Sequence, residues 1–96
     1  MKNLEELKTT LARHKSALQK KYKIKHLGIF GSYANRSAEE QSDLDILVEF
    51  EQPIGLDFVS LAEELEALLG VKVDLVSKNA IKPNKLPFVL EDLIHV

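Results

Sequence analysis

The apolar residues in the first quarter of the chain recur at a helical period. They fall on one stripe between residues 4 and 22, formed by Leu4, Leu7, Leu11, Leu18 and Tyr22. This spacing predicts an amphipathic helix. Asn3 precedes the stripe and Glu6 follows three residues later, which is the order of a capping box in which the Asn side chain accepts a hydrogen bond from the first turn. His14 continues the stripe, so we expect it to be partly buried.

Three shorter segments have the composition or the alternation of β-strands. Residues 24–30 are apolar and rich in branched side chains, and the Gly31-Ser32 pair ends this run. Residues 43–50 alternate between an apolar face and a face that carries Asp43 and Asp45. Residues 71–76 alternate in the same way around Asp74. We therefore predict three strands, with a helical turn at 33–36 and a polar loop at 37–42 between the first two.

The remaining segments predict two further helices. Apolar residues at helical spacing indicate a helix over 57–69, and Gly70 supplies its C-terminal stop. After a polar linker at 77–86, Pro87 suits the first turn of a short last helix at 88–95. The order helix, strand, strand, helix, strand, helix predicts one α+β (mixed α/β) domain over residues 1–96, in which helices cover a small sheet. Periodicity does not fix the order of the strands.

Composition restricts the class of protein. The chain has 96 residues and no cysteine, which excludes disulfides and thiolate metal sites and suits the cytoplasm. No apolar run approaches the roughly 20 residues of a membrane span, and the polar N-terminus does not resemble a signal peptide. We therefore expect a cytoplasmic protein that makes no use of a membrane.

The net charge of −2 hides a strong asymmetry along the chain. Eight of the thirteen basic residues lie in the first 25 positions, and residues 39–66 contain ten carboxylates but no Lys or Arg. One interpretation is a solvated basic helix and a solvated acidic surface. The other is a basic surface for phosphates or a partner, together with carboxylates that hold a cation.

Asp43 and Asp45 break the local rule for a strand. Residues two apart on a strand share a face, so both carboxylates point the same way and repel each other unless a cation lies between them. Asp is also unfavourable in strand interiors. If the third strand lies beside the second, Asp74 can join the pair, and three convergent carboxylates can hold two magnesium ions for phosphoryl or nucleotidyl transfer. The alternative is an edge strand with one solvated face.

Gly31-Ser32 is the second candidate feature. Glycine lets the backbone approach a ligand closely, and the following N–H groups with the Ser32 hydroxyl can bind phosphate oxygens. Alone, a Gly-Ser pair is also a common turn. With ten residues between this pair and Asp43-Leu44-Asp45, the chain reproduces the pattern G-S-x10-D-x-D.

This pattern resembles that of the nucleotidyltransferase superfamily that includes DNA polymerase beta. The stretches around Ile29-Phe30-Gly31-Ser32-Tyr33-Ala34 and Ser42-Asp43-Leu44-Asp45 are similar to the minimal nucleotidyltransferases (MNT) in particular. The resemblance extends to the strand that carries Asp74 and covers nearly the whole chain. It implies a mixed sheet with helices packed against it and an open face that holds the site.

The resemblance also implies roles for individual residues. Asp43 and Asp45 would bind two Mg²⁺ ions, and Asp74 would complete the site that activates the acceptor hydroxyl. Gly31 and Ser32 would hold the triphosphate of ATP, the substrate. Relatives often have Arg followed by Gly or Asn after Gly-Ser-Tyr-Ala, whereas this chain has Asn35-Arg36. Because a non-glycine residue tolerates the left-handed turn less well, Arg36 is either a nucleotide ligand by a changed path or a solvated residue.

Many minimal members are antitoxins paired with a HEPN-family ribonuclease toxin, and some transfer AMP to a tyrosine of it. The resemblance therefore implies Mg²⁺-dependent transfer of AMP to a hydroxyl of a HEPN-type partner. Two alternatives stay open: a binding module of the same fold that neutralises a toxin by occlusion, and transfer to a small molecule. Direct nucleic-acid binding is not expected. The sequence leaves open the acceptor, the nucleotide preference and whether the chain forms homo- or hetero-oligomers.

Overall fold

The first helix, α1 (Leu4–Tyr22), begins where the capping box predicts. In the computed structural model, which describes residues 2–96, the Asn3 side chain accepts a hydrogen bond from the Glu6 backbone N–H at 2.9 Å. The helix ends at Lys23, whose backbone is left-handed at φ 58°. All five residues of the predicted stripe are buried, and His14 is half-buried as expected.

Four strands form one mixed sheet in the order β3-β2-β1-β4. β1 (Ile24–Phe30) is antiparallel to both of its neighbours, β2 (Leu44–Phe50) and β4 (Ile94–His95). β3 (Val73–Ser77) runs parallel to β2. The mixed sheet confirms the predicted fold class, and the pairing of β2 with β3 places Asp74 on the strand beside Asp45.

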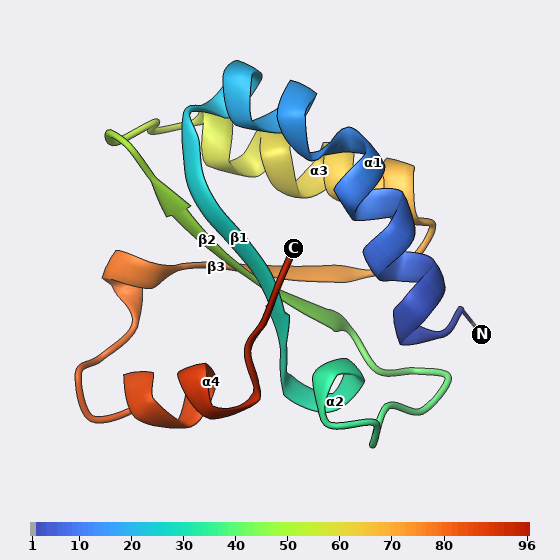
Figure 1. Ribbon diagram of the computed structural model, residues 1–96. Helices are drawn as coiled ribbons and strands as arrows, with labels where there is room; N and C mark the ends of the chain where they lie inside the picture. Colours follow the sequence, from blue (N-terminus) through green and yellow to red (C-terminus); the bar gives the residue numbers. More distant parts are fainter. Residues whose placement is uncertain (1) are drawn as a thin grey trace.

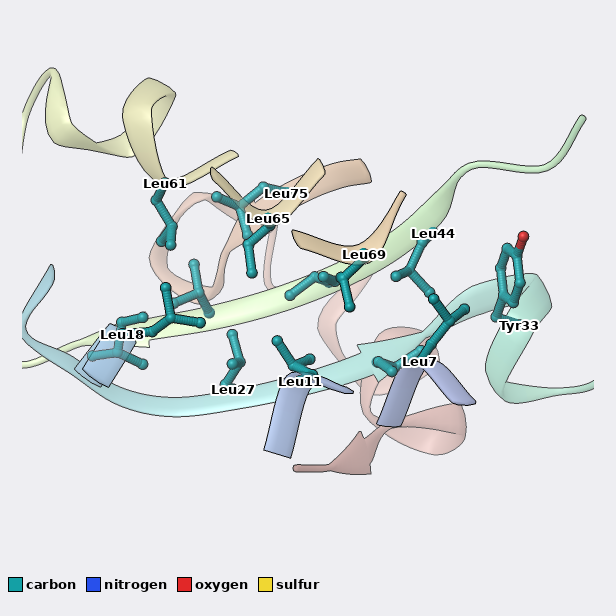
Figure 2. Packing of buried hydrophobic residues seen from close by; sticks show 14 of the residues in the cluster. Leu7, Leu11, Leu18, Leu27, Tyr33, Leu44, Leu61, Leu65, Leu69 and Leu75 are labelled. Atoms are coloured by element: carbon teal, nitrogen blue, oxygen red, sulfur yellow. The ribbon is translucent and has the colours of Figure 1, made fainter. Parts of the chain in front are cut away.

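Two helices cover one face of this sheet. Figure 1 shows α1 and α3 (Asp57–Leu69) side by side across the strands. Between helices and sheet lies a core in which leucine predominates, seen in Figure 2. It includes Leu7, Leu11, Leu44, Ile46, Val48, Leu61, Leu65 and Leu69, each at most 1% exposed. Burying such side chains is the main term that stabilises a domain of this size.

The opposite side of the sheet carries shorter elements. The four-residue helix α2 (Gly31–Ala34) follows β1, a 3-10 turn η1 (Lys78–Ala80) follows β3, and α4 (Leu86–Asp92) precedes β4. In Figure 1, α2 and α4 lie across the sheet from α1 and α3. They leave the carboxylate-bearing end of β2 and β3 open to solvent.

The prediction of a helix over 88–95 is wrong at its end. α4 stops at Asp92, and Ile94–His95 form β4, which pairs with Gly28 and Ile29 of β1. Gly28 allows this close approach, because a Cβ there would lie 2.6 Å from Leu93 Cδ1. Leaving the helix lets the last residues pair with an otherwise open part of β1 and bury apolar side chains against it.

Other boundaries differ by one or two residues from the prediction. β2 starts at Leu44 rather than at residue 43, β3 spans Val73–Ser77 rather than 71–76, and the turn predicted at 33–36 is α2 at Gly31–Ala34. The polar linker contains η1, which periodicity did not indicate. Within residues 2–96, none of the helices combines the length and the apolar character needed to cross a membrane.

Candidate active site

Two of the predicted carboxylates are direct neighbours across the parallel strands. Asp45 of β2 and Asp74 of β3 are partners in the register. Both therefore project to the same face, opposite the one that α1 and α3 cover. Asp74 is exposed and Asp45 is half-buried. The two carboxylates thus lie side by side on one face of the sheet, which the sequence left conditional on the pairing of their strands.

The surroundings of Asp45 disfavour its charge. Partial burial raises the pKa of the Asp45 carboxyl to about 6, and Asp74 contributes by repulsion and by a hydrogen bond to it. The Asp43 carboxylate, which precedes β2, adds a smaller effect in the same direction. No cation is among the causes of this shift. When neighbouring carboxylates raise the pKa of a carboxyl group, a cation placed between them stabilises the ionised form of that group.

The donor set fits magnesium as the ion, although residues 2–96 contain no ready-made group of three or more acidic or histidine ligands. Magnesium prefers oxygen ligands, keeps several waters and is usually held by one or two carboxylates together with substrate phosphates. Asp45 and Asp74 are adjacent, and the exposed Asp43 lies two residues before Asp45, just ahead of β2. These carboxylates match that requirement. The roles of the three residues as ligands stay a prediction.

Gly31 lies directly against Asp45. It follows Phe30, whose partner in the β1–β2 register is Asp45. Its φ is +72°, a left-handed value that favours glycine, and an added Cβ would overlap Asp45 Oδ2. Any side chain at residue 31 would therefore displace the carboxylate. Ser32 comes next, half-buried at the start of α2, where it remains a predicted phosphate ligand.

The structure places Arg36 at the turn that follows α2. Its φ of 64° is left-handed, which is the backbone that the sequence comparison with Gly or Asn suggested for this position. One guanidinium nitrogen lies 3.4 Å from Glu5 Oε1 of α1, and both side chains are about two-thirds exposed. Such a surface pair contributes little stability. Binding of a nucleotide by Arg36 stays a prediction.

Two further residues lie near the start of β2 and β3. Tyr33 follows the Gly-Ser pair, where its ring could stack on a base or pack in the core; it is only 4% exposed, so the ring packs in the core. Lys72 precedes β3, and its carbonyl oxygen accepts a hydrogen bond of 2.8 Å from the Leu44 N–H. The sequence contains an indication of where Lys72 lies, because Lys72 is two residues before Asp74 just as Asp43 is two residues before Asp45. Since Asp45 pairs with Asp74, Lys72 and Asp43 are expected to lie beside each other.

Comparisons with known proteins show the family of the chain. A family model described as "Nucleotidyltransferase domain" matches residues 11–96. A Methanocaldococcus jannaschii protein, whose name classes it among protein adenylyltransferases, is 52% identical over the full length of both chains. The protein adenylyltransferase MntA of Thermococcus cleftensis is 44% identical, over all of this chain and 98% of the relative.

Solved structures give the same result for the fold. One described as a minimal nucleotidyltransferase superposes with a TM-score of 0.77 at 39% identity, over 94% of this chain and 95% of the other. A complex described as a tri-AMPylated Shewanella oneidensis HEPN toxin with an MNT antitoxin matches with a TM-score of 0.67 at 21% identity, over 93% and 70%. At that identity the second match concerns the fold alone. The chain belongs to the nucleotidyltransferase domain family, as a minimal member whose named homologues are protein adenylyltransferases.

Proposed function

We propose that this chain transfers AMP from ATP, in a magnesium-dependent reaction, to a hydroxyl of a HEPN-family partner protein. The observation that carries the proposal is the contact between three elements: Asp45 beside Asp74 in the sheet, with Gly31 against the Asp45 carboxylate. Carboxylates for a cation, next to a backbone that has no side chain, are what a phosphate chain and its metal require.

Each residue has a distinct part in this proposal. Asp43 and Asp45 would hold two magnesium ions, which when bound neutralise the charge that develops on the attacked phosphate and on the departing pyrophosphate. Gly31 leaves space for the Asp45 carboxylate, so that its backbone would bring the triphosphate close to the metal ligands, and Ser32 donates its hydroxyl to a phosphate oxygen. Asp74 lies on the far side of Asp45 from Gly31, because β2 separates β3 from β1. We therefore assign Asp74 to the acceptor hydroxyl, whose proton it accepts or orients.

A protein acceptor is supported by the exposure of the site and by the relatives. Asp43 and Asp74 are both exposed, so a hydroxyl on the surface of another protein can reach them. The homologues are named protein adenylyltransferases, and one matching complex is described as containing an AMP-modified HEPN toxin. These names support a HEPN-type partner in an antitoxin role for this chain.

The test is the mass of the partner after incubation. A HEPN-type candidate partner is mixed with the wild-type chain, ATP and MgCl₂, and intact-protein mass spectrometry measures AMP addition. Asp74→Asn should bind ATP but abolish transfer, whereas Asp45→Asn should weaken both. Asp57→Asn is the matched control, since this exposed Asp in the first turn of α3 lies outside the site and should behave like wild type.

The outcomes separate the proposal from its alternatives. AMP addition by the wild type and Asp57→Asn, absent with Asp74→Asn, supports transfer. If the wild type neutralises the partner without changing its mass, and all three variants do the same, the function is occlusion. If the partner is never modified but a small hydroxyl compound is, the acceptor class is wrong.

A further inference from the structure

A hollow borders the carboxylates on the side where β2 and β3 begin. It measures about 540 Å³, within the range of small-ligand sites. The residues relevant here are Lys2, Tyr33, Glu40, Ser42, Asp43 and Lys72. Because Asp43 belongs both to this hollow and to the predicted metal ligands, anything bound in the hollow lies next to one of those predicted ligands.

Lys72 occupies a fixed place in this hollow. The register pairs Leu44 with Val73 and Asp45 with Asp74, and the Leu44 N–H donates to the Lys72 carbonyl at 2.8 Å. The two ladder contacts set Lys72 alongside the start of β2, next to Asp43. Lys72 also stands two residues before Asp74, so its side chain is directed to the same face of the sheet.

The Lys72 ammonium is not used within the described fold. Among residues 2–96, the ion pairs within 4 Å join Lys21 to Glu64, Arg36 to Glu5 and Lys78 to Glu49, and none includes Lys72. Lys2, the other lysine of the hollow, differs, because its ammonium donates to the Leu69 carbonyl at 2.8 Å. Lys72 is therefore a lysine of the hollow that forms no ion pair within 4 Å with a described carboxylate.

The Tyr33 hydroxyl is a second donor in the same hollow. Its ring is buried among core leucines, whereas Figure 2 shows its oxygen directed away from them. Among the side-chain hydrogen bonds found in residues 2–96, none involves this oxygen, and it is not a buried atom without a partner. An ammonium and a phenol hydroxyl that share a hollow and lack partners match the needs of a phosphate.

We infer that Lys72, assisted by the Tyr33 hydroxyl, binds a phosphate group in the hollow beside Asp43. The inference rests on the proposed function. Glu40 and Asp43 oppose an anion in the hollow, so we assign the phosphate to a ligand that also brings magnesium or is covalently held. Two sources share this chemistry: the α-phosphate of ATP, or the phosphate of an AMP unit already joined to the acceptor.

The second source has a chemical consequence. A ribose hydroxyl of the joined AMP would attack the α-phosphorus of a new ATP. The new O–P bond forms, the bond to pyrophosphate breaks, and the hydroxyl proton passes to Asp74 or to water. Lys72 would then hold the acceptor nucleotide in place for each later addition, and so set how many AMP units accumulate.

The experiment compares Lys72→Gln and Lys72→Arg with the wild type, and uses Lys25→Gln as the control. Lys25 is an exposed lysine at the opposite end of β1 from Gly31, so its loss removes equal charge outside the site. Calorimetry measures affinity for ATP with MgCl₂, and intact mass measures how many AMP units the HEPN-type partner gains. A thermal melt shows that each variant is folded.

In Lys72→Gln, either the affinity for ATP or the addition of AMP units to the partner should fall about tenfold or more, as expected when a hydrogen bond to a charged group is lost. Lys72→Arg should recover part of this loss. Weaker ATP binding identifies the donor phosphate. Unchanged ATP binding, with addition stopped after the first AMP, identifies the acceptor phosphate. Equality of Lys72→Gln and Lys25→Gln in both readouts overturns the inference. If the wild type binds ATP but does not modify the partner, the proposed acceptor is wrong, while the ATP affinity of Lys72→Gln still tests the inference. If the wild type binds no ATP, the proposed function and the inference on Lys72 both fail.

Discussion

The two faces of strand β2 carry opposite chemistry at alternate residues. Leu44, Ile46 and Val48 are fully buried under α1 and α3. On the other face Asp45 lies beside Asp74 and against Gly31, and burial with nearby carboxylates raises its pKa to about 6. One strand thus holds the centre of the core and the centre of the candidate site, one residue apart.

The difference separates what stabilises the fold from what serves the site. The helix-covered face gains free energy of folding by removing apolar area from water. The open face places charges of one sign together, which destabilises the isolated chain, and it has a left-handed backbone at residue 31 that favours glycine. Substitutions on the two faces should therefore affect different measurements, and in one case with opposite sign.

The largest effect on folding should come from the covered face. Leu61 of α3 is 0% exposed, and Leu61→Ala should lower the free energy of unfolding by about 2–5 kcal/mol, through lost burial and the cavity left behind. Leu56→Ala is the matched control, because Leu56 is 89% exposed, and it should change stability by less than about 0.5 kcal/mol. Urea denaturation measures both. Equal effects would show that the core does not extend under α3.

Gly31 should give the largest effect on transfer. Gly31→Ala adds a Cβ that overlaps Asp45 Oδ2, so the carboxylate must move, and transfer should fall about a hundredfold or more. Gly55→Ala tests the backbone term alone, since Gly55 also has a left-handed φ of +56° but nothing lies within 4 Å of an added Cβ. It should lower stability by about 1 kcal/mol and leave transfer unchanged.

If the two glycine variants lose transfer equally, contact with Asp45 is not what distinguishes Gly31 from Gly55. Equal loss of transfer in both would mean that the activity depends on general backbone strain. Full transfer by Gly31→Ala, measured by partner mass at a temperature where the variant is folded, would place the phosphate away from Gly31. Ser32→Ala, which removes a single hydroxyl and no space, should have a smaller effect than Gly31→Ala.

The sequence predicts the covered face better than the open one. The helices over 4–22 and 57–69 follow from leucine spacing, because a helix buries its stripe whatever its partner is. The pairing of Asp45 with Asp74 depended on strand order, which periodicity does not contain, and the resemblance supplied it. β4 was not predicted, because two residues are too few to show an alternating pattern and they form a strand only by pairing with β1. The contact of Gly31 with Asp45 and the free Lys72 ammonium required coordinates.

Asp45 provides the test in which the sign reverses. The Asp45 pKa is about 6 in the folded protein and near its ordinary 3.8 when unfolded, so between these values the folded state binds more protons. Stability from this group is therefore present below about pH 4 and is lost as the pH rises through about 6. Without metal, Asp45→Asn should raise the free energy of unfolding at about pH 7.5 by about 1 kcal/mol, a value reduced for solvent screening.

The measurement is urea denaturation of both proteins at about pH 4 and about pH 7.5, without magnesium. Asp57→Asn again serves as the control, because its carboxylate is exposed and remote from the site. Asp45→Asn should differ from it at the higher pH and approach it at the lower. If ATP with MgCl₂ is added, the wild type should gain more stability than Asp45→Asn, because a ligand that binds only the folded state stabilises it. Destabilisation by Asp45→Asn at the higher pH would mean that Asp45 is a structural residue.

The smallest effect concerns Arg36, whose guanidinium pairs with Glu5 of α1 and not with Asp43, Asp45 or Asp74 in this fold. Its φ of 64° disfavours a residue with a Cβ by about 1 kcal/mol, and its pair with Glu5 is exposed. Arg36→Gly should therefore be more stable than Arg36→Ala by somewhat under 1 kcal/mol, since glycine also orders a freer unfolded chain. The two variants lose the same guanidinium, so their ATP affinities should fall together if Arg36 binds phosphate. Calorimetry with ATP and MgCl₂ decides: affinity equal to wild type in both would leave Arg36 with no part in the site, and a loss in Arg36→Ala alone would trace the effect to the turn.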